Sequence, residues 1–169
     1  MRGRAGDLAV VFGAVPTGAE ALGVTRSVSI DVSFAVPVDV SVAVRALIAG
    51  GMRHRARDEV VYLIDKDGLF DWKRASASLV CEVLSEMADP RWRDRVVGMT
   101  LHFPDGDGDG DVGGDLLFHP GRTSASFVAC VNTRRLPGSV FCDTGWYLRR
   151  LVPLLEPLCL TEIGTMDSP

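Results

Sequence analysis

Residues 27–36 carry the strictest two-residue alternation in the chain. Apolar side chains at Val28, Ile30, Val32 and Phe34 alternate with serine, aspartate and alanine. Successive side chains of a strand point to opposite faces of a sheet, so this pattern predicts a strand with one buried face and one polar face. Pro37 should end the strand, because proline cannot donate a hydrogen bond to the neighbouring strand.

The segment after Pro37 is open to two interpretations. Asp39 is a suitable N-cap for a helix that buries Val40, Val44 and Leu47 on one side and stops at two glycines, residues 50–51. The valines between residues 38 and 44 also alternate, which leaves a longer strand as the alternative. We favour the helix.

The remaining chain shows alternating and helical periodicities separated by turn residues. Strands are expected at residues 60–64, 69–72, 96–103, 115–119, 123–132 and 161–166, and helices at 76–88 and from Asp143 onward. Pro153 should kink or shorten the last helix. Short turns between consecutive strands favour a largely antiparallel sheet of about five to seven strands, with two or three helices packed mainly on one face. The prediction is therefore a single α+β domain over residues 25–169, preceded by an irregular arm or edge strand at residues 1–24.

Charge and cysteine content narrow the class of protein. The net charge is −4 and the pI is about 5.3, which argues against a nucleic-acid partner, since such proteins carry a basic face. The four cysteines are widely spaced, as expected for reduced thiols in the cytoplasm. The apolar run at residues 8–15 loosely imitates a secretion signal, but Asp7 and Pro16 interrupt it, and no stretch reaches the roughly 20 apolar residues of a membrane span.

Most of the negative charge lies in one glycine-rich loop. Its aspartates are Asp105, Asp107, Asp109, Asp111 and Asp115. The loop begins like a calcium-binding loop, but Leu116 stands where a bidentate glutamate is required, so we expect a solvated hairpin tip instead. Such a tip is a candidate surface for binding another protein.

No motif for nucleophilic catalysis or for phosphate binding occurs in the chain. His102 and His119 flank the predicted hairpin, and with nearby acids they could form a metal-dependent or hydrolytic site. The spacing of these residues is not diagnostic. We therefore predict no catalytic residue, no metal ligand and no cofactor, and keep a small enzyme as the alternative.

Tryptophans beside charged residues are candidates for a protein interface. Trp72, Trp92 and Trp146 each lie next to arginine, aspartate or turn residues, a combination that is enriched where proteins meet. They could equally close the edges of the core. The basic run at residues 53–57 is interpreted as a solvated loop, because two acids follow it directly.

The C-terminal half combines the hairpin strand at residues 114–118, the strand at 126–130 and the segment 143–148, which leads a helix into a last strand. In this layout the chain resembles the small α+β immunity proteins that bacteria pair with polymorphic toxins. The resemblance implies a protein-binding module that neutralises a cognate toxin by occluding it, with a basic toxin domain as the candidate partner. A structural or oligomer-forming subunit is a third alternative.

Overall fold

The structure is a computed structural model that describes residues 27–54, 58–104 and 111–168. Its strands are β1 (Ser27–Phe34), β2 (Glu59–Ile64), β3 (Trp72–Ser76), β4 (Val97–Phe103), β5 (Val112–Phe118), β6 (Ser124–Val131) and β7 (Leu160–Ser168). Its helices are α1 (Val40–Ala49), α2 (Val80–Met87) and α3 (Thr144–Leu155). Along the chain they follow the order β-α-β-β-α-β-β-β-α-β, which is the predicted order. The predicted arm at residues 1–24 lies outside the described residues.

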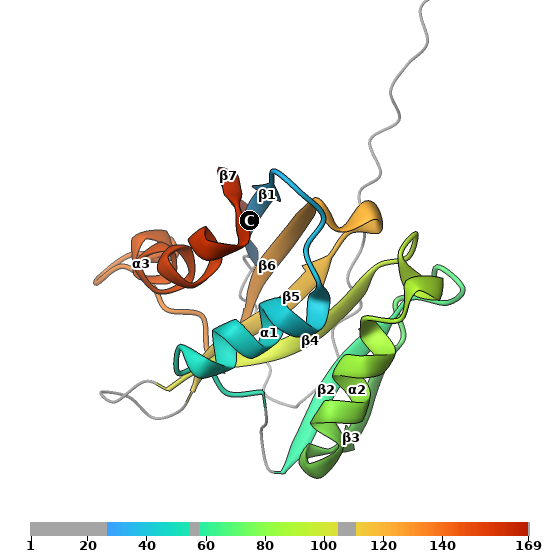
Figure 1. The fold of residues 1–169 in the computed structure, drawn as a ribbon. Coiled ribbons are helices and arrows are strands. Elements are labelled where there is room, and N and C mark those ends of the chain that lie inside the picture. The colour runs from blue at the N-terminus through green and yellow to red at the C-terminus, as the bar shows by residue number, and fades with distance from the viewer. Residues whose placement is uncertain (1–26, 55–57, 105–110, 169) are drawn as a thin grey trace, which may run out of the picture.

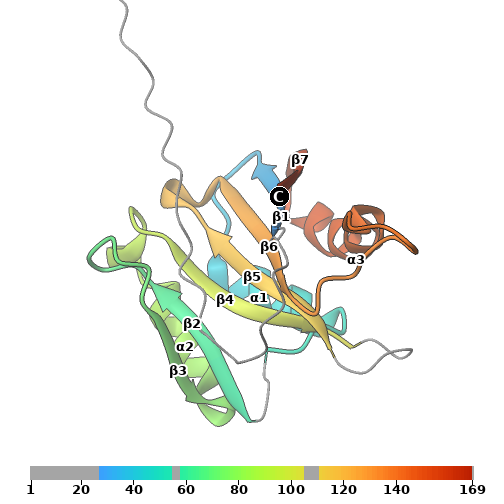
Figure 2. The same ribbon diagram turned by 180° about the vertical axis from the view of Figure 1, so that it is seen from behind.

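The seven strands form one sheet in the order β3-β2-β4-β5-β6-β1-β7. Every neighbouring pair is antiparallel, which confirms the predicted α+β class. Helices α1 and α2 lie across the front of the sheet in Figure 1, and in the opposite view the strands lie in front of them (Figure 2). The opposite face of the sheet carries none of these helices and is called the open face below. Among the described residues, no helix is long and apolar enough to cross a membrane.

The alternation in β1 places its apolar side chains toward the helices. Val28, Ile30, Val32 and Phe34 are each at most 5 % exposed, and they pack in one core with apolar residues of β4, β5 and β6. Each helix contributes its apolar stripe to the same core. Burial of these side chains from water is the main favourable contribution to folding.

Local sequence signals decide where the elements begin. The Asp39 carboxylate accepts a hydrogen bond from the Val42 amide at 2.9 Å, so the helix prediction for this segment is confirmed and the longer strand is wrong. The Asp143 carboxylate caps α3 through the Trp146 amide at 3.0 Å in the same way. Helix α3 runs through Pro153 to Leu155, so this proline does not shorten the helix before its last turn.

Two predicted strand positions are wrong. The strand expected at residues 69–72 begins only at Trp72, because Gly68 and Phe70 both have positive φ and lengthen the turn after β2. The strand expected to begin at Asp115 begins at Val112. Asp115 therefore lies in the middle of β5 and is not part of the loop.

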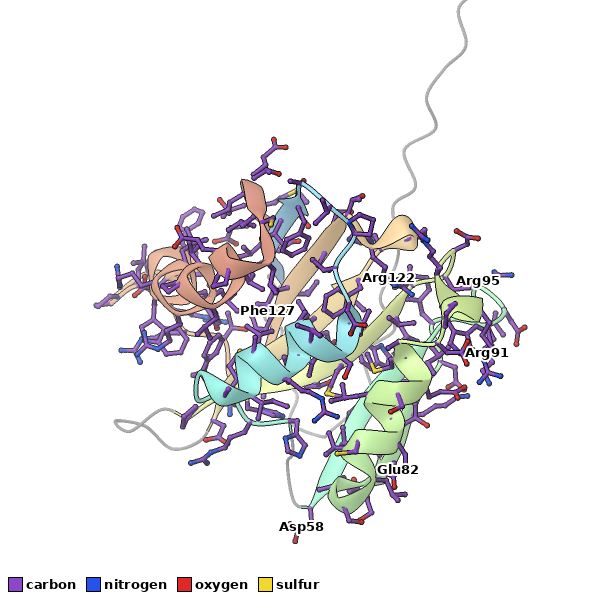
Figure 3. All side chains as sticks on the ribbon, viewed as in Figure 1. Asp58, Glu82, Arg91, Arg95, Arg122 and Phe127 are labelled. Carbon is purple, nitrogen blue, oxygen red and sulfur yellow. The ribbon has the colours of Figure 1, made fainter. Side chains whose placement is uncertain are left out.

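Arg122 joins several segments of the fold. It lies in the short 3-10 turn Pro120–Arg122 between β5 and β6, and the residue is only 6 % exposed. Its guanidinium donates to the carbonyls of Trp92, Arg95, Phe118 and His119 at 2.5 to 3.1 Å. Its own carbonyl accepts from the Val38 amide at 2.9 Å, which holds the segment before α1. Figure 3 shows Arg122 near the base of α1, with Arg95 on the adjoining segment.

Candidate functional site

The loop end of the β4–β5 hairpin brings together charged residues from four separate segments. We call this region the hairpin end and define it by Arg53, His102, Phe103, Asp111, Asn132, Arg134, Trp146 and Arg150. Arg53 and His102 exchange backbone hydrogen bonds of 2.7 and 2.8 Å, so the segment after α1 runs along the end of β4. This pairing fixes the backbone of the Arg53 segment against the sheet.

Asp111 is held at the base of the loop by two neighbours. The Arg53 guanidinium lies 3.4 Å from the Asp111 carboxylate, and the Asn132 amide donates to the Asp111 carbonyl at 3.1 Å. The Arg53 side chain is 57 % exposed and the Asp111 side chain 34 % exposed. Both charges therefore remain available to solvent, and such an exposed ion pair contributes little to stability.

Trp146 supports two arginines at the same end of the sheet. Its ring is packed edge-on against Phe103, with centroids 5.2 Å apart, and the residue is only 5 % exposed. The guanidinium carbon of Arg150 lies 3.8 Å from the centroid of the indole ring, and that of Arg134 lies 5.2 Å from it. A cation held over an indole face is stabilised by the ring's electron density. The indole thus orients two cations at the surface, while it is itself a core side chain.

Asp115 has a structural environment. It faces the open side of β5, where its carboxylate accepts from the Thr100 hydroxyl at 2.7 Å and from the Cys130 thiol at 3.5 Å. Burial raises the pKa of Asp115 above its ordinary value. Burial and the adjacent Asp115 carboxylate raise the pKa of Cys130 to about 12, so this thiol stays protonated at neutral pH.

The other three predicted loop aspartates, Asp105, Asp107 and Asp109, lie outside the described residues, as does the calcium-like opening of that loop. Of the five aspartates proposed from the sequence, the structure places only Asp111 at the hairpin end.

The three tryptophans do not share a surface. Trp72 begins β3 opposite Leu63 on the open face, close to Gly98 of β4. Trp92 lies on the 3-10 turn Pro90–Trp92, between the Lys66 ammonium at 5.1 Å and the Arg91 guanidinium at 4.8 Å from its ring. Only Trp146 belongs to the hairpin end.

His102 and His119 lie at opposite ends of the β4–β5 hairpin. His102 pairs with Gly113 near the loop, whereas His119 follows the far end of β5. The span from residue 113 to 119 at the rise of a strand separates the two side chains by about 20 Å. Among the described residues, no group of three or more histidine, cysteine, aspartate or glutamate side chains could hold a metal ion. The structure therefore does not bring His102 and His119 together.

A second polar cluster, which the sequence did not indicate, connects β6 and β1. The Ser126 hydroxyl donates to the Asp31 carboxylate at 2.5 Å and lies 2.7 Å from the His119 Nε2. A hydroxyl has one proton, so with that proton directed to Asp31 the His119 Nε2 must be the donor to Ser126. His119 then cannot take a proton from Ser126, as a catalytic base would have to. The residues resemble a catalytic triad in composition, but their hydrogen bonds have the wrong direction.

No protein-family model, no curated protein and no solved structure matches this chain. The hairpin end and the polar cluster must therefore be interpreted from their own chemistry. The convergence of Arg53, Asp111, Arg134 and Arg150 depends on contacts between residues far apart in the sequence. The only sequence signal for it was the neighbourhood of tryptophan and arginine around residue 146.

Proposed function

We propose that this protein is a protein-binding module, and that it acts as an immunity-type inhibitor which neutralises a cognate toxin by covering it. The observation that supports this proposal is the hairpin end. There Arg53, Asp111, Arg134 and Arg150 lie together at the surface, and Asp111 belongs to the glycine- and aspartate-rich loop.

The physical properties of the hairpin end suit recognition of a charged surface. Two arginines rest on a buried indole, and arginine is enriched at protein interfaces because its planar guanidinium makes several contacts. Ordering these side chains before binding reduces the entropy that is lost when the complex forms. The aspartates of the loop would contact a basic partner and steer its approach.

The alternative of a small enzyme receives no support from the described residues. His102 and His119 are far apart, and the Ser126 hydroxyl donates to Asp31, not to His119. We also propose a bacterial cytoplasmic location. All four cysteines lie among the described residues and are free thiols, which fits a reducing compartment.

The proposal is tested by capturing partners from the native lysate with the tagged full chain. Asp105, Asp107, Asp109 and Asp111 are replaced together by asparagine, and Asp115 is kept because it is structural. A matched control replaces four exposed carboxylates elsewhere, Asp67, Asp71, Glu82 and Glu156, with their amides. Both variants lose the same charge. A difference between their affinities for the partner therefore reports where the carboxylates were removed and not the change in net charge.

We expect the wild-type chain and the control variant to retain one stoichiometric partner, and the hairpin variant to bind it at least about tenfold more weakly with a smaller salt dependence. Equal affinity of all three chains would show that the hairpin end is not the binding surface. If the purified partner is a toxin, its activity should fall when the wild-type chain is added. A captured partner without such activity would refute the inhibitor role.

A further inference from the structure

The two edges of the sheet differ in how they are protected. One edge is β3, a strand of five residues that contains Lys73 and Arg74. Charged residues of this kind, especially lysine, and short length are the usual devices that prevent an edge from pairing with another chain. The other edge is β7, with nine residues and no lysine, arginine or proline.

The central part of β7, residues 161–166, is exposed. Among the described residues β7 pairs as a strand only with β1, and near its C-terminal end the Asp167 carboxylate accepts a hydrogen bond from the Cys142 amide at 3.0 Å. Ile163 is 38 % exposed and Met166 is 59 % exposed, one on each face of the sheet. In both ribbon views β7 lies at the margin of the sheet beside β1 (Figures 1 and 2).

The sequence of β7 is complementary to itself. In an antiparallel pair centred on Ile163, this residue lies opposite its own copy, and Thr161 lies opposite Thr165 of the second copy. The same register places Leu160 opposite Met166 and Glu162 opposite Gly164. Branched and apolar residues therefore face one another, and no like charges are opposed.

We propose that β7 pairs with the β7 of a second copy of this chain, forming a two-fold symmetric dimer with one continuous sheet. The unpaired backbone groups of the edge supply the hydrogen bonds, and the self-complementary side chains fix the register. This inference does not depend on the hairpin end, which lies on other strands.

The test is the molar mass of the full chain, measured by light scattering between about 5 and about 300 µM, a range suited to a micromolar association. We expect the mass to rise from 18.2 kDa toward twice that value. Ile163→Lys should weaken the dimer at least about tenfold, because two like-charged side chains would start from Cβ atoms about 5 Å apart across the axis. Leu69→Lys is the control, since Leu69 is 79 % exposed in the turn after β2 and its replacement should leave the dimer intact.

A charge exchange tests the register. Ile163→Glu alone should weaken the dimer to a similar degree, whereas an equimolar mixture of Ile163→Lys and Ile163→Glu should recover the wild-type affinity. A wild-type chain that stays at 18.2 kDa over the whole range would overturn the proposal and leave the edge to a strand of another protein. An unchanged dimer affinity in Ile163→Lys, or a mixture that binds no more tightly than either variant alone, would overturn it as well. Circular dichroism shows whether each variant is folded.

Discussion

Removal of the Arg122 side chain should be among the most damaging single changes to this fold. In Arg122→Ala, four backbone carbonyls lose a charged donor. A hydrogen bond to a charged group contributes about 1.5–3 kcal/mol, but three of these four share Nη1, and water can replace some of them. We therefore expect a loss of about 3–5 kcal/mol, against a total stability of about 5–15 kcal/mol for an ordinary domain.

Urea unfolding followed by circular dichroism measures this loss. Arg95→Ala is the matched control, because the Arg95 side chain is exposed and only its carbonyl receives the bond from Arg122, so a change within about 0.5 kcal/mol is expected. Arg122 also has a φ of 62°, in the left-handed region. Arg122→Gly should consequently be about 1 kcal/mol less damaging than Arg122→Ala. An Arg122→Ala protein within about 1 kcal/mol of the wild type would refute the reasoning.

Two further predictions concern the centre of the sheet. Because burial raises the folded-state pKa of Asp115, the folded state binds its proton more tightly than the unfolded state, so this residue should make the protein more stable as the pH falls from neutral through that raised pKa. Asp115→Asn should lose this gain in stability at lower pH, and urea unfolding at a series of pH values would detect the loss. Identical pH profiles of stability for the two proteins would contradict the prediction. A Cβ at Gly114 would run into the Val128 carbonyl, so Gly114→Ala should destabilise the protein by about 1–3 kcal/mol in thermal unfolding. The control is Gly164→Ala, which has open space around the added Cβ and should change the stability by less than about 0.5 kcal/mol.

Local patterns in the sequence predicted most of the fold. The alternation in β1 and the aspartate caps at Asp39 and Asp143 act within a few residues, so they can be recognised without knowing the rest of the structure. The position of β3 failed for a local reason, since a positive φ at Phe70 could not be foreseen for an aromatic residue.

The candidate site was harder to predict from the sequence because its contacts are not local. Arg53 and Asp111 are 58 residues apart, and Asp31 and Ser126 are 95 apart. Such pairs follow only from the strand order and register. Asp115 illustrates the same point, because a shift of three residues at the start of β5 moved it from a predicted loop into a hydrogen-bonded position on a sheet face.

The place of β1 between β6 and β7 has a consequence for how the chain folds as it is synthesised. Strands β2 to β6 each pair with a strand made soon before or after them, whereas β1 must wait for β6 and β7. The hydrogen bond from Thr161 to the Ser33 carbonyl spans 128 residues, and pairings of this kind close late and slow folding. Strand β1, which has the clearest sequence pattern, leaves the ribosome before the other described strands of the sheet. Its pairing on both sides is complete only when β7 has emerged.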